Sequence, residues 1–472
     1  MRYDAIVVGS GFASTFFLLE YLGRTRRPCQ ILVVERGFRE PREWQLQHRR
    51  VSRITSEETF RRKGKADKAW KFTLAFGGGS NCWFGCTPRL LPNDFRMKSV
   101  YGVGDDWPLS YDDLVPYYER VEQVMAISGP EERWPYPRRG PYPQPPHRLS
   151  DPDRILQRAY PAHYFAQPTA RARVAVGRRS ACCSNGVCGL CPIDAKFTIE
   201  NSLAEVYQDP RVSLRLDAAV QSIDIANDRV TGVVIANGDR LERIDGDLVV
   251  LGAGAIFNAA ILLRSGVSHP MLGARLFEQL SVVADIDLVG VDNFQGSTAF
   301  TGHGYMLYDG PHRSRHAGSL IESLNRPDQL RWESGRERQL LHLKFLVDDL
   351  PQARNRVVIG SDNVPVLEFH DYHDYAYRGI EAIASRIHEI LAPLPVERIA
   401  FDPRPAPTEG HALGTVVMGN DPATSIVDKT LLHHRLRNLA VVGASAFPTG
   451  SPSNPTLTLS ALAAWSGAHL AG

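Results

Sequence analysis

Val7-Val8-Gly9-Ser10-Gly11-Phe12-Ala13-Ser14 joins an apolar run to a helical stretch through two closely spaced glycines. The pattern predicts a strand, a tight turn and a helix start, which together bring the backbone close to a pyrophosphate at the helix N-terminus. Ser14 stands in place of the usual third glycine and is small enough for close helix–strand packing. A glycine turn often serves geometry alone, so its surroundings have to decide.

The surroundings form a βαβ pattern. Residues 5–8 and 31–35 read as strands on either side of the helical stretch. Glu35 ends the second strand about twenty residues after the turn, where an acidic side chain would bind ribose hydroxyls. We therefore expect a dinucleotide here, although a glycine turn does not separate FAD from NAD.

The bulk composition excludes several classes of function. The chain has 472 residues, more than one hydrophobic core usually supports, so two structural domains are expected. A formal net charge of +2 draws the protein neither to nucleic acid nor to an anionic membrane. No apolar run reaches the ~20 residues that span a bilayer, so direct membrane insertion is not expected. The N-terminus does not resemble a signal peptide, so the expected location is cytoplasmic, with export by a partner subunit left open.

Strands and helices elsewhere are expected in widely separated segments. Residues 212–216, 220–225 and 230–235 read as a small antiparallel meander, and residues 247–251 and 439–442 as single buried strands. The dinucleotide fold is thus expected to be assembled from distant pieces of chain.

Three other stretches have a local interpretation. Ser110 and Asp113 form a capping box, which predicts a helix start. The proline-rich residues 129–146 predict an irregular connection. The basic stretch from Arg49 to Lys71 is expected to be a solvated face or a mobile loop, with a docking patch for an acidic redox partner as the alternative.

Four further segments resemble those of one enzyme family, the glucose–methanol–choline (GMC) oxidoreductases. They are the glycine-rich residues 76–89, the second signature at 251–266, the histidine segment 411–419 and the closing segment 448–458. Within the family the chain looks closest to pyranose oxidases and to bacterial FAD-dependent sugar dehydrogenases.

The resemblance implies an α/β fold, α+β overall, in which a Rossmann-like FAD-binding domain carries a smaller substrate domain with an antiparallel sheet. Residues 349–358 fit a strand of that sheet. The implied division assigns 1–99, 195–269 and 406–472 to the FAD-binding domain, 100–194 to an insertion and 270–405 to the substrate domain.

The resemblance also implies which residues contact FAD. Cys82 stands where related sugar enzymes often carry a histidine, covalently attached to the flavin in some of them, so non-covalent FAD is expected and an inert thiol is favoured. The implied FAD contacts are Gly9, Gly11, Phe12, Ala13, Glu35, Gly78, Gly79, Ser80, Asn81, Cys82, Trp83, Val220, Ala253, Gly254, Ala444, Ser445, Pro455 and Thr456.

An alcohol carbon gives up hydride readily only when its hydroxyl proton leaves too. A histidine of near-neutral pKa suits that proton, and a second hydrogen-bonding residue must hold the oxygen. By the resemblance, His411 is the base and Asn454 is its partner. A merely structural His411 is the alternative, but the match of both segments favours the catalytic role.

Four cysteines lie between 182 and 191. Cys182, Cys188 and Cys191 resemble the cluster loop of FAD sugar dehydrogenases, which implies an iron–sulfur cluster of the 3Fe–4S type. The last gap is one residue shorter than in those enzymes, and proline after the final cysteine is common in ferredoxin-type runs. Free thiols or a local disulfide are the equally weighted alternative.

The expected function is FAD-dependent oxidation of an alcohol group of a sugar, polyol or related substrate, with hydride passing to flavin N5 and electrons to a carrier. An acceptor protein or small subunit would then be a partner. The alternatives are a peroxide-forming oxidase and a flavoprotein without turnover. A set of polar residues fits either a substrate pocket, slightly favoured, or a surface loop: His303, Tyr305, His312, Arg313 and Arg315.

Overall fold

The computed structural model describes residues 2–237 and 240–471, and the glycine turn lies in it where a βαβ unit is expected. β1 (Arg2–Val8) leads into α1 (Phe12–Arg24), and β2 (Ile31–Val34) returns parallel to β1. All four residues of β2 are buried, as a strand covered on both faces requires. The βαβ unit is therefore confirmed.

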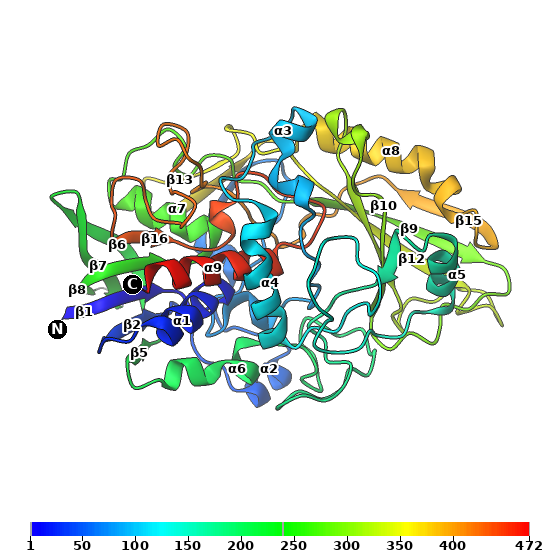
Figure 1. Ribbon diagram of the computed structural model, residues 1–472, viewed down its shortest axis with the longest axis horizontal. Coiled ribbons are helices and arrows are strands. Elements are labelled where there is room, and N and C mark those ends of the chain that lie inside the picture. Colours follow the sequence, from blue (N-terminus) through cyan, green and yellow to red (C-terminus); the bar gives the residue numbers. More distant parts are fainter. Residues whose placement is uncertain (1, 238–239, 472) are drawn as a thin grey trace.

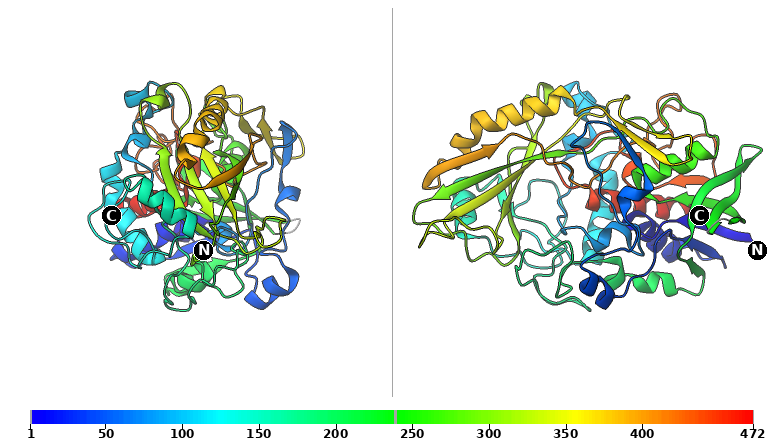
Figure 2. Two further views of the ribbon diagram at one scale, coloured as in Figure 1. Left: turned by 90° about the vertical axis from the view of Figure 1, so that its right-hand side faces the viewer. Right: turned by 180° about the vertical axis from the view of Figure 1, so that it is seen from behind.

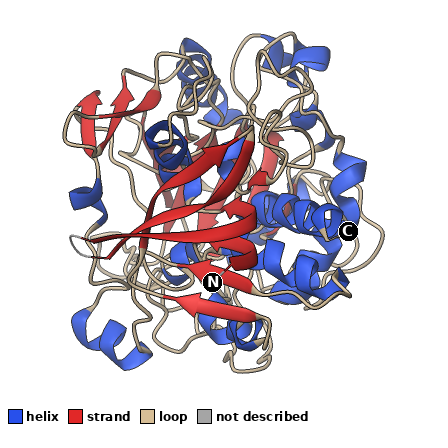
Figure 3. Cartoon of the chain, turned by 90° about the vertical axis from the view of Figure 1, so that its left-hand side faces the viewer, coloured by secondary structure: helices blue, strands red, loops and turns tan. Residues whose placement is uncertain are grey.

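This unit is part of a sheet assembled from distant segments (Figures 1 and 3). The first half of β8 pairs antiparallel with β7, and its second half runs parallel to β1 and β16. From one edge the order is β5 (Val212–Arg215), β2, β1, β8 (Arg240–Leu251), β7 (Arg229–Asn237) and β6 (Ala219–Ala226), with β16 (Leu439–Val441) beside β8.

One strand of the predicted meander lies elsewhere. β5 pairs parallel with β2, Val212 opposite Ile31, and not with β6, so its assignment to the meander was wrong. Asp217 adopts a left-handed φ of 52°, which turns the chain between the two strands. The edge of β2 is covered in this way, and only β6, β7 and the start of β8 form the meander.

A second sheet, antiparallel throughout, occupies the other end of the molecule (Figures 1 and 2). α8 packs closely on one of its faces. A Cβ atom added at Gly379 of this helix would lie only 3.0 Å from Val347 Cγ1 of the sheet. The antiparallel sheet expected from the family resemblance is confirmed. Its order is β15 (Val396–Asp402), β9 (Leu280–Leu288), β12 (Leu340–Val347), β11 (Ser319–Leu324), β10 (Phe300–Leu307) and β4 (Tyr164–Ala166), with α8 at Asp374–Leu391.

A third, small sheet corrects two expectations. It consists of β13 (Arg356–Ile359), β14 (Pro365–Phe369) and β3 (Arg61–Gly64). Residues 349–358 were assigned to the antiparallel sheet, but only their end forms a strand, and it pairs with β14. The basic stretch was expected to be a solvated face or a mobile loop. Its residues in β3 are all exposed, as a solvated face would be, but Lys68 is buried and departs from this expectation.

The helix predicted from the capping box is confirmed as α4 (Tyr111–Met125), where Ser110 Oγ accepts from the Asp113 N–H. It lies between the two large sheets (Figure 1). No helix of the described residues is both long and apolar enough to cross a membrane. The remaining helices are α2 (Arg42–His48), α3 (Met97–Tyr101), α5 (Asp151–Ala159), α6 (Ile199–Ser202), α7 (Gly254–Arg264) and α9 (Thr456–Leu470), with 3₁₀ turns η1 (Ser56–Thr59), η2 (Gly78–Asn81), η3 (Pro92–Phe95), η4 (Ala204–Gln208), η5 (Pro311–Ser314) and η6 (Ala444–Ala446).

Candidate active site

Three glycine-bearing segments meet at the N-terminus of α1. Gly9 has a φ of +91°, and a Cβ there would lie 2.7 Å from Gly252 O. Gly78 has a φ of +50°, and its Cβ would lie 3.1 Å from Gly11 Cα. A side chain at either position would push these backbones apart. The dinucleotide turn, the segment after β8 and the loop of η2 therefore pack together only because these residues are glycine.

The N-terminus of α1 has no partner of its own. Gly11 provides no side-chain cap, and the first turn, which starts with the buried Phe12 and Ala13, contains no acidic residue. The free N–H groups and the positive end of the helix dipole suit an anion such as a pyrophosphate.

Glu35, expected to bind a ribose, is already hydrogen-bonded to the protein. Its carboxylate accepts from the Ser10 N–H at 3.0 Å, the Ser10 hydroxyl at 2.7 Å and the Gly37 N–H at 2.8 Å. Burial raises the pKa of Glu35 despite these donors. The side chain thus braces the glycine turn, and its contact with a ribose stays a prediction.

The loop of η2 is fixed by hydrogen bonds from Lys196, whose role was not expected from the sequence. Lys196 is buried, and its Nζ donates to Asn81 O at 3.0 Å and to Trp83 O at 2.9 Å. Burial lowers the pKa of Lys196 to about 8. Trp83 packs edge-on against Phe12 with ring centroids 4.7 Å apart, which fixes the loop against α1.

A second missed residue, Asn258, joins two more of the predicted segments. Its Oδ1 accepts from the Ala253 N–H at 2.8 Å, and its Nδ2 donates to Ser445 Oγ at 2.9 Å. The start of α7 and the turn η6 are therefore tied to each other. The other predicted contact residues lie on η2 (Gly78, Gly79, Ser80), in β6 (Val220), at the start of α7 (Gly254), in η6 (Ala444) and at the start of α9 (Pro455, Thr456).

Cys82 follows η2 directly and is partly buried. Its sulfur accepts a hydrogen bond from the Thr73 hydroxyl at 3.0 Å and lies 3.6 Å from Gly79 O. The thiol is thus occupied within its own loop, as an inert side chain would be.

The structure brings the His411 segment and the Asn454 segment together through Gln279. His411 Nδ1 lies 2.9 Å from Gln279 Oε1, and Gln279 Nε2 donates to Ser453 O at 2.7 Å. Glu278 accepts from the His411 N–H at 3.1 Å and so holds its backbone. Two polar residues in the otherwise apolar run 276–280 were the sign of this role in the sequence.

Asn454 has an unsatisfied acceptor. The side chain is 7% exposed, and within the described part of the chain its buried Oδ1 has no hydrogen-bond partner. A buried amide oxygen without a donor is costly, so it is suited to a donor from outside the chain, such as a hydroxyl group.

His411 is less basic than expected. Burial lowers its pKa to about 4; Lys344 acts in the same direction, whereas Glu409 and Glu322 oppose it. The pKa of His411 thus lies below the near-neutral value expected from the sequence. An imidazole of this kind stays neutral, and able to accept a proton, throughout the neutral range.

A row of polar side chains lies near His411, on the face of the antiparallel sheet opposite α8. His303 of β10, Glu322 of β11 and Lys344 of β12 stand opposite one another across neighbouring strands. Lys344 forms an ion pair with Glu409, two residues before His411. Gln167 Nε2 approaches His303 Nε2 at 2.7 Å and Glu322 Oε1 at 3.3 Å. Such a wall provides donors and acceptors for a hydroxylated ligand.

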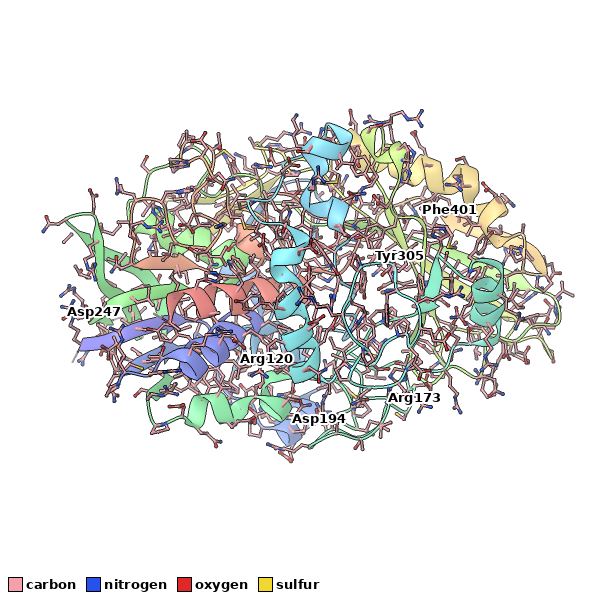
Figure 4. The ribbon with its side chains drawn as sticks, viewed as in Figure 1. Arg120, Arg173, Asp194, Asp247, Tyr305 and Phe401 are labelled. Atoms are coloured by element: carbon pink, nitrogen blue, oxygen red, sulfur yellow. The ribbon has the colours of Figure 1, made fainter. Side chains whose placement is uncertain are left out.

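The five polar residues considered for a pocket divide into three groups. Arg313 is fully buried between Asp94 and Asp348, so it is a structural ion pair. His312 lies with it on η5, and Arg315 is exposed. Only His303 and Tyr305 are buried in the sheet, and Figure 4 shows Tyr305 in the same half of the molecule as Phe401, away from Asp247. The pocket assignment was wrong for Arg313 and Arg315.

The cysteine loop does not form a ready metal site. Cys188 is buried, whereas Cys182 and Cys191 are partly exposed, and all three are free thiols. Among the residues that the structure describes, no three His, Cys, Asp or Glu side chains are arranged to hold a metal ion. An iron–sulfur cluster at this loop therefore stays a prediction from the family resemblance.

The chain is similar to known oxidoreductases over most of its length. Residues 351–463 match the GMC oxidoreductase family. The fructose dehydrogenase large subunit of Gluconobacter japonicus is 26% identical, covering 85% of this chain and 81% of its own. The 6'''-hydroxyparomomycin C oxidase of Streptomyces lividus is 29% identical, covering 97% and 89%.

Two further comparisons agree. The paromamine 6'-oxidase of Streptomyces fradiae is 27% identical and covers 100% of this chain and 91% of its own. The crystal structure of pyridoxine 4-oxidase from Mesorbium loti superposes with a TM-score of 0.66 over 99% of both chains. At 17% identity this last likeness shows the fold alone.

Proposed function

We propose that this chain is a GMC oxidoreductase, which oxidises a hydroxyl group of a sugar or related polyol and passes the electrons to a carrier. The observation that carries the proposal is the convergence of His411 and the Asn454 segment on Gln279. A flavoprotein without turnover would not need a neutral histidine and an unsatisfied amide oxygen on two segments that one side chain joins.

GMC oxidoreductases bind FAD, and the residues around α1 fit that group. The uncapped helix start would hold the pyrophosphate, and the contact of Gly11 with Gly78 leaves no side chain in its way. Ala253, Ser445 and Pro455 are proposed contacts further along. When bound, FAD supplies the two-electron acceptor for the hydride.

The protein's own residues perform the proton chemistry. His411 accepts the hydroxyl proton of the substrate at Nε2, because its Nδ1 is engaged with Gln279. Asn454 Oδ1 is free to accept a hydrogen bond and so to orient the substrate. The alcohol carbon loses a hydride as its oxygen loses the proton, and a carbonyl group results.

The polar row supports a substrate with several hydroxyl groups. Burial alone would raise the pKa of Glu322, but His303 and Lys344 outweigh it and the carboxyl remains ionised. Lys344 offers donors on the same face. A simple alkyl alcohol would leave these groups without partners, which disfavours its binding.

A carrier as electron acceptor is favoured by the resemblance to sugar dehydrogenases. One relative is named as a large subunit, so we propose a protein partner that takes the electrons. The second candidate is a peroxide-forming oxidase, favoured by the two aminoglycoside oxidases, which match 97% and 100% of this chain.

No step of the proposal uses the cysteine loop. The iron–sulfur cluster predicted for that loop stays a prediction, which iron and sulfide analysis would decide.

Purified protein is expected to be yellow and to release all its FAD on denaturation, because Cys82 stands where a histidine makes the covalent link in some relatives. The measurement is the flavin absorbance of the supernatant after acid precipitation. Cys82→Ala is the control and should release as much. Flavin retained in the pellet of the parent, but not of Cys82→Ala, would contradict the non-covalent assignment.

The proposed function is tested by anaerobic bleaching of the bound flavin with glucose, fructose, gluconate, glycerol and glucosamine. At least one polyhydroxylated compound should bleach it, and ethanol should not. Turnover of that compound only with an added quinone dye supports the carrier, and peroxide formed in air without dye supports the oxidase. Flavin that no member of the panel bleaches would count against the substrate class.

A further inference from the structure

Gln279 occupies a position that settles the protonation pattern of the histidine beside it. The side chain is 2% exposed and lies just before β9. Its Nε2 donates to Ser453 O at 2.7 Å and faces Pro452 O at 3.4 Å. Both partners are carbonyl oxygens, which only accept, so the amide nitrogen must point toward them.

The opposite end of the amide then faces His411. Gln279 Oε1 lies 2.9 Å from His411 Nδ1, and an amide oxygen can only accept a hydrogen bond. Nδ1 must therefore carry the proton. A flipped amide could donate to a bare Nδ1, but it would set its oxygen against the carbonyl oxygens of Ser453 and Pro452 and lose both hydrogen bonds there, so the flip is excluded.

We propose that Gln279 is a positioning residue, which holds His411 as the Nδ1–H tautomer so that Nε2 is the basic atom, and which sets the spacing between His411 and Asn454. The inference deepens the proposed function and rests on it. The same amide is hydrogen-bonded to Ser453, the residue before Asn454, so one side chain positions both His411 and the Asn454 segment.

A neutral partner also suits the return of the proton. After His411 accepts the hydroxyl proton at Nε2, the imidazolium would donate from Nδ1 to a neutral amide. A carboxylate in that place would stabilise the charged form and keep the proton on the ring. Gln279 therefore orients His411 without raising the proton affinity of its imidazole.

The direct test is the tautomer of His411 by long-range ¹H–¹⁵N correlation on ¹⁵N-histidine-labelled holoenzyme. The His411 signals are identified by their loss in His411→Asn. The parent should show protonated Nδ1 and bare Nε2, and Gln279→Leu should show a mixture or the other tautomer. Bare Nδ1 in the parent, or an unchanged tautomer in Gln279→Leu, would overturn the proposal without any substrate being needed.

A second arm adds charge to the same position. Gln279→Glu should raise the pKa of His411 from about 4 by roughly one to three units, since a carboxylate then faces the ring. Gln339→Glu is the matched control. It adds the same charge at a residue that is hydrogen-bonded to Gly290 and Arg336, and it should not shift the pKa of His411. No shift in Gln279→Glu would show that the contact does not govern the histidine.

The third arm measures flavin reduction by whichever compound of the panel bleaches the parent. Gln279→Leu should slow it roughly 10–100-fold with FAD content unchanged, an effect like that of outer hydrogen-bond partners of functional histidines. If Gln279→Leu has an altered His411 tautomer but reduces its flavin at the rate of the parent, the proposal is overturned. A panel that fails on the parent would contradict the proposed function and leave the tautomer result to judge Gln279.

Discussion

Replacing His411 by alanine is expected to slow reduction of the bound flavin by roughly 10²–10⁴-fold, the usual contribution of a general base. The variant should still bind FAD, because the implied flavin contacts lie on other segments and its nearest partner is the side chain of Gln279. The measurement is the anaerobic reduction rate at saturating substrate, with FAD content from absorbance.

His388→Ala is the matched control for this variant. His388 is exposed on α8, away from the polar row, and its loss should leave both the rate and the FAD content unchanged. His411→Ala that reduces its flavin at the parental rate would refute the assignment of the base. Loss of FAD together with the rate would instead indicate a structural role.

Lys68→Met is expected to destabilise the protein by about 3–5 kcal/mol, the cost of leaving one member of a buried ion pair alone. Lys68 and Glu278 are 2% and 0% exposed and pair with each other beneath the His411 segment. Burial raises the pKa of Glu278, and Glu409 acts in the same direction, whereas Lys68 and the His411 N–H oppose it. The measurement is the free energy of unfolding in urea.

Two variants make this prediction specific. Lys63→Met removes a partner of Glu368 from a pair in which the lysine is 65% exposed, and it should cost less than about 1 kcal/mol. The double variant Lys68→Met with Glu278→Leu should recover most of the stability, because no charge is then buried alone. The double variant should nevertheless reduce its flavin more slowly than the parent, since Glu278 also accepts from the His411 N–H. A Lys68→Met protein as stable as its parent would contradict the buried-pair argument.

Local signals were sufficient wherever structure is decided by neighbours in the chain. The glycine turn and the capping box at Ser110 were both found where expected. Their geometry depends on backbone conformation and hydrogen bonds within a few residues. The resemblance added the distant segments and the antiparallel sheet, because those motifs occur in a fixed order.

Errors arose where the partner of a segment is far away in sequence. β5 was placed beside β6, its neighbour in the chain, although it pairs with β2. Lys68 was read as solvated because its charge carries no sign of Glu278. Arg313 was read as a substrate contact for the same reason, since the two carboxylates that enclose it come from other elements.

The sequence by itself determined the dinucleotide turn, because the turn depends on residue types at short, fixed spacings. The family resemblance of several local motifs indicated the candidate pair His411 and Asn454. Only the tertiary structure decided how that pair is connected. Gln279 reaches His411 and Ser453 from a third segment, and burial there lowers the pKa of the histidine. Neither effect can be read from spacing, because hydrogen-bond direction and desolvation depend on which groups the fold encloses together.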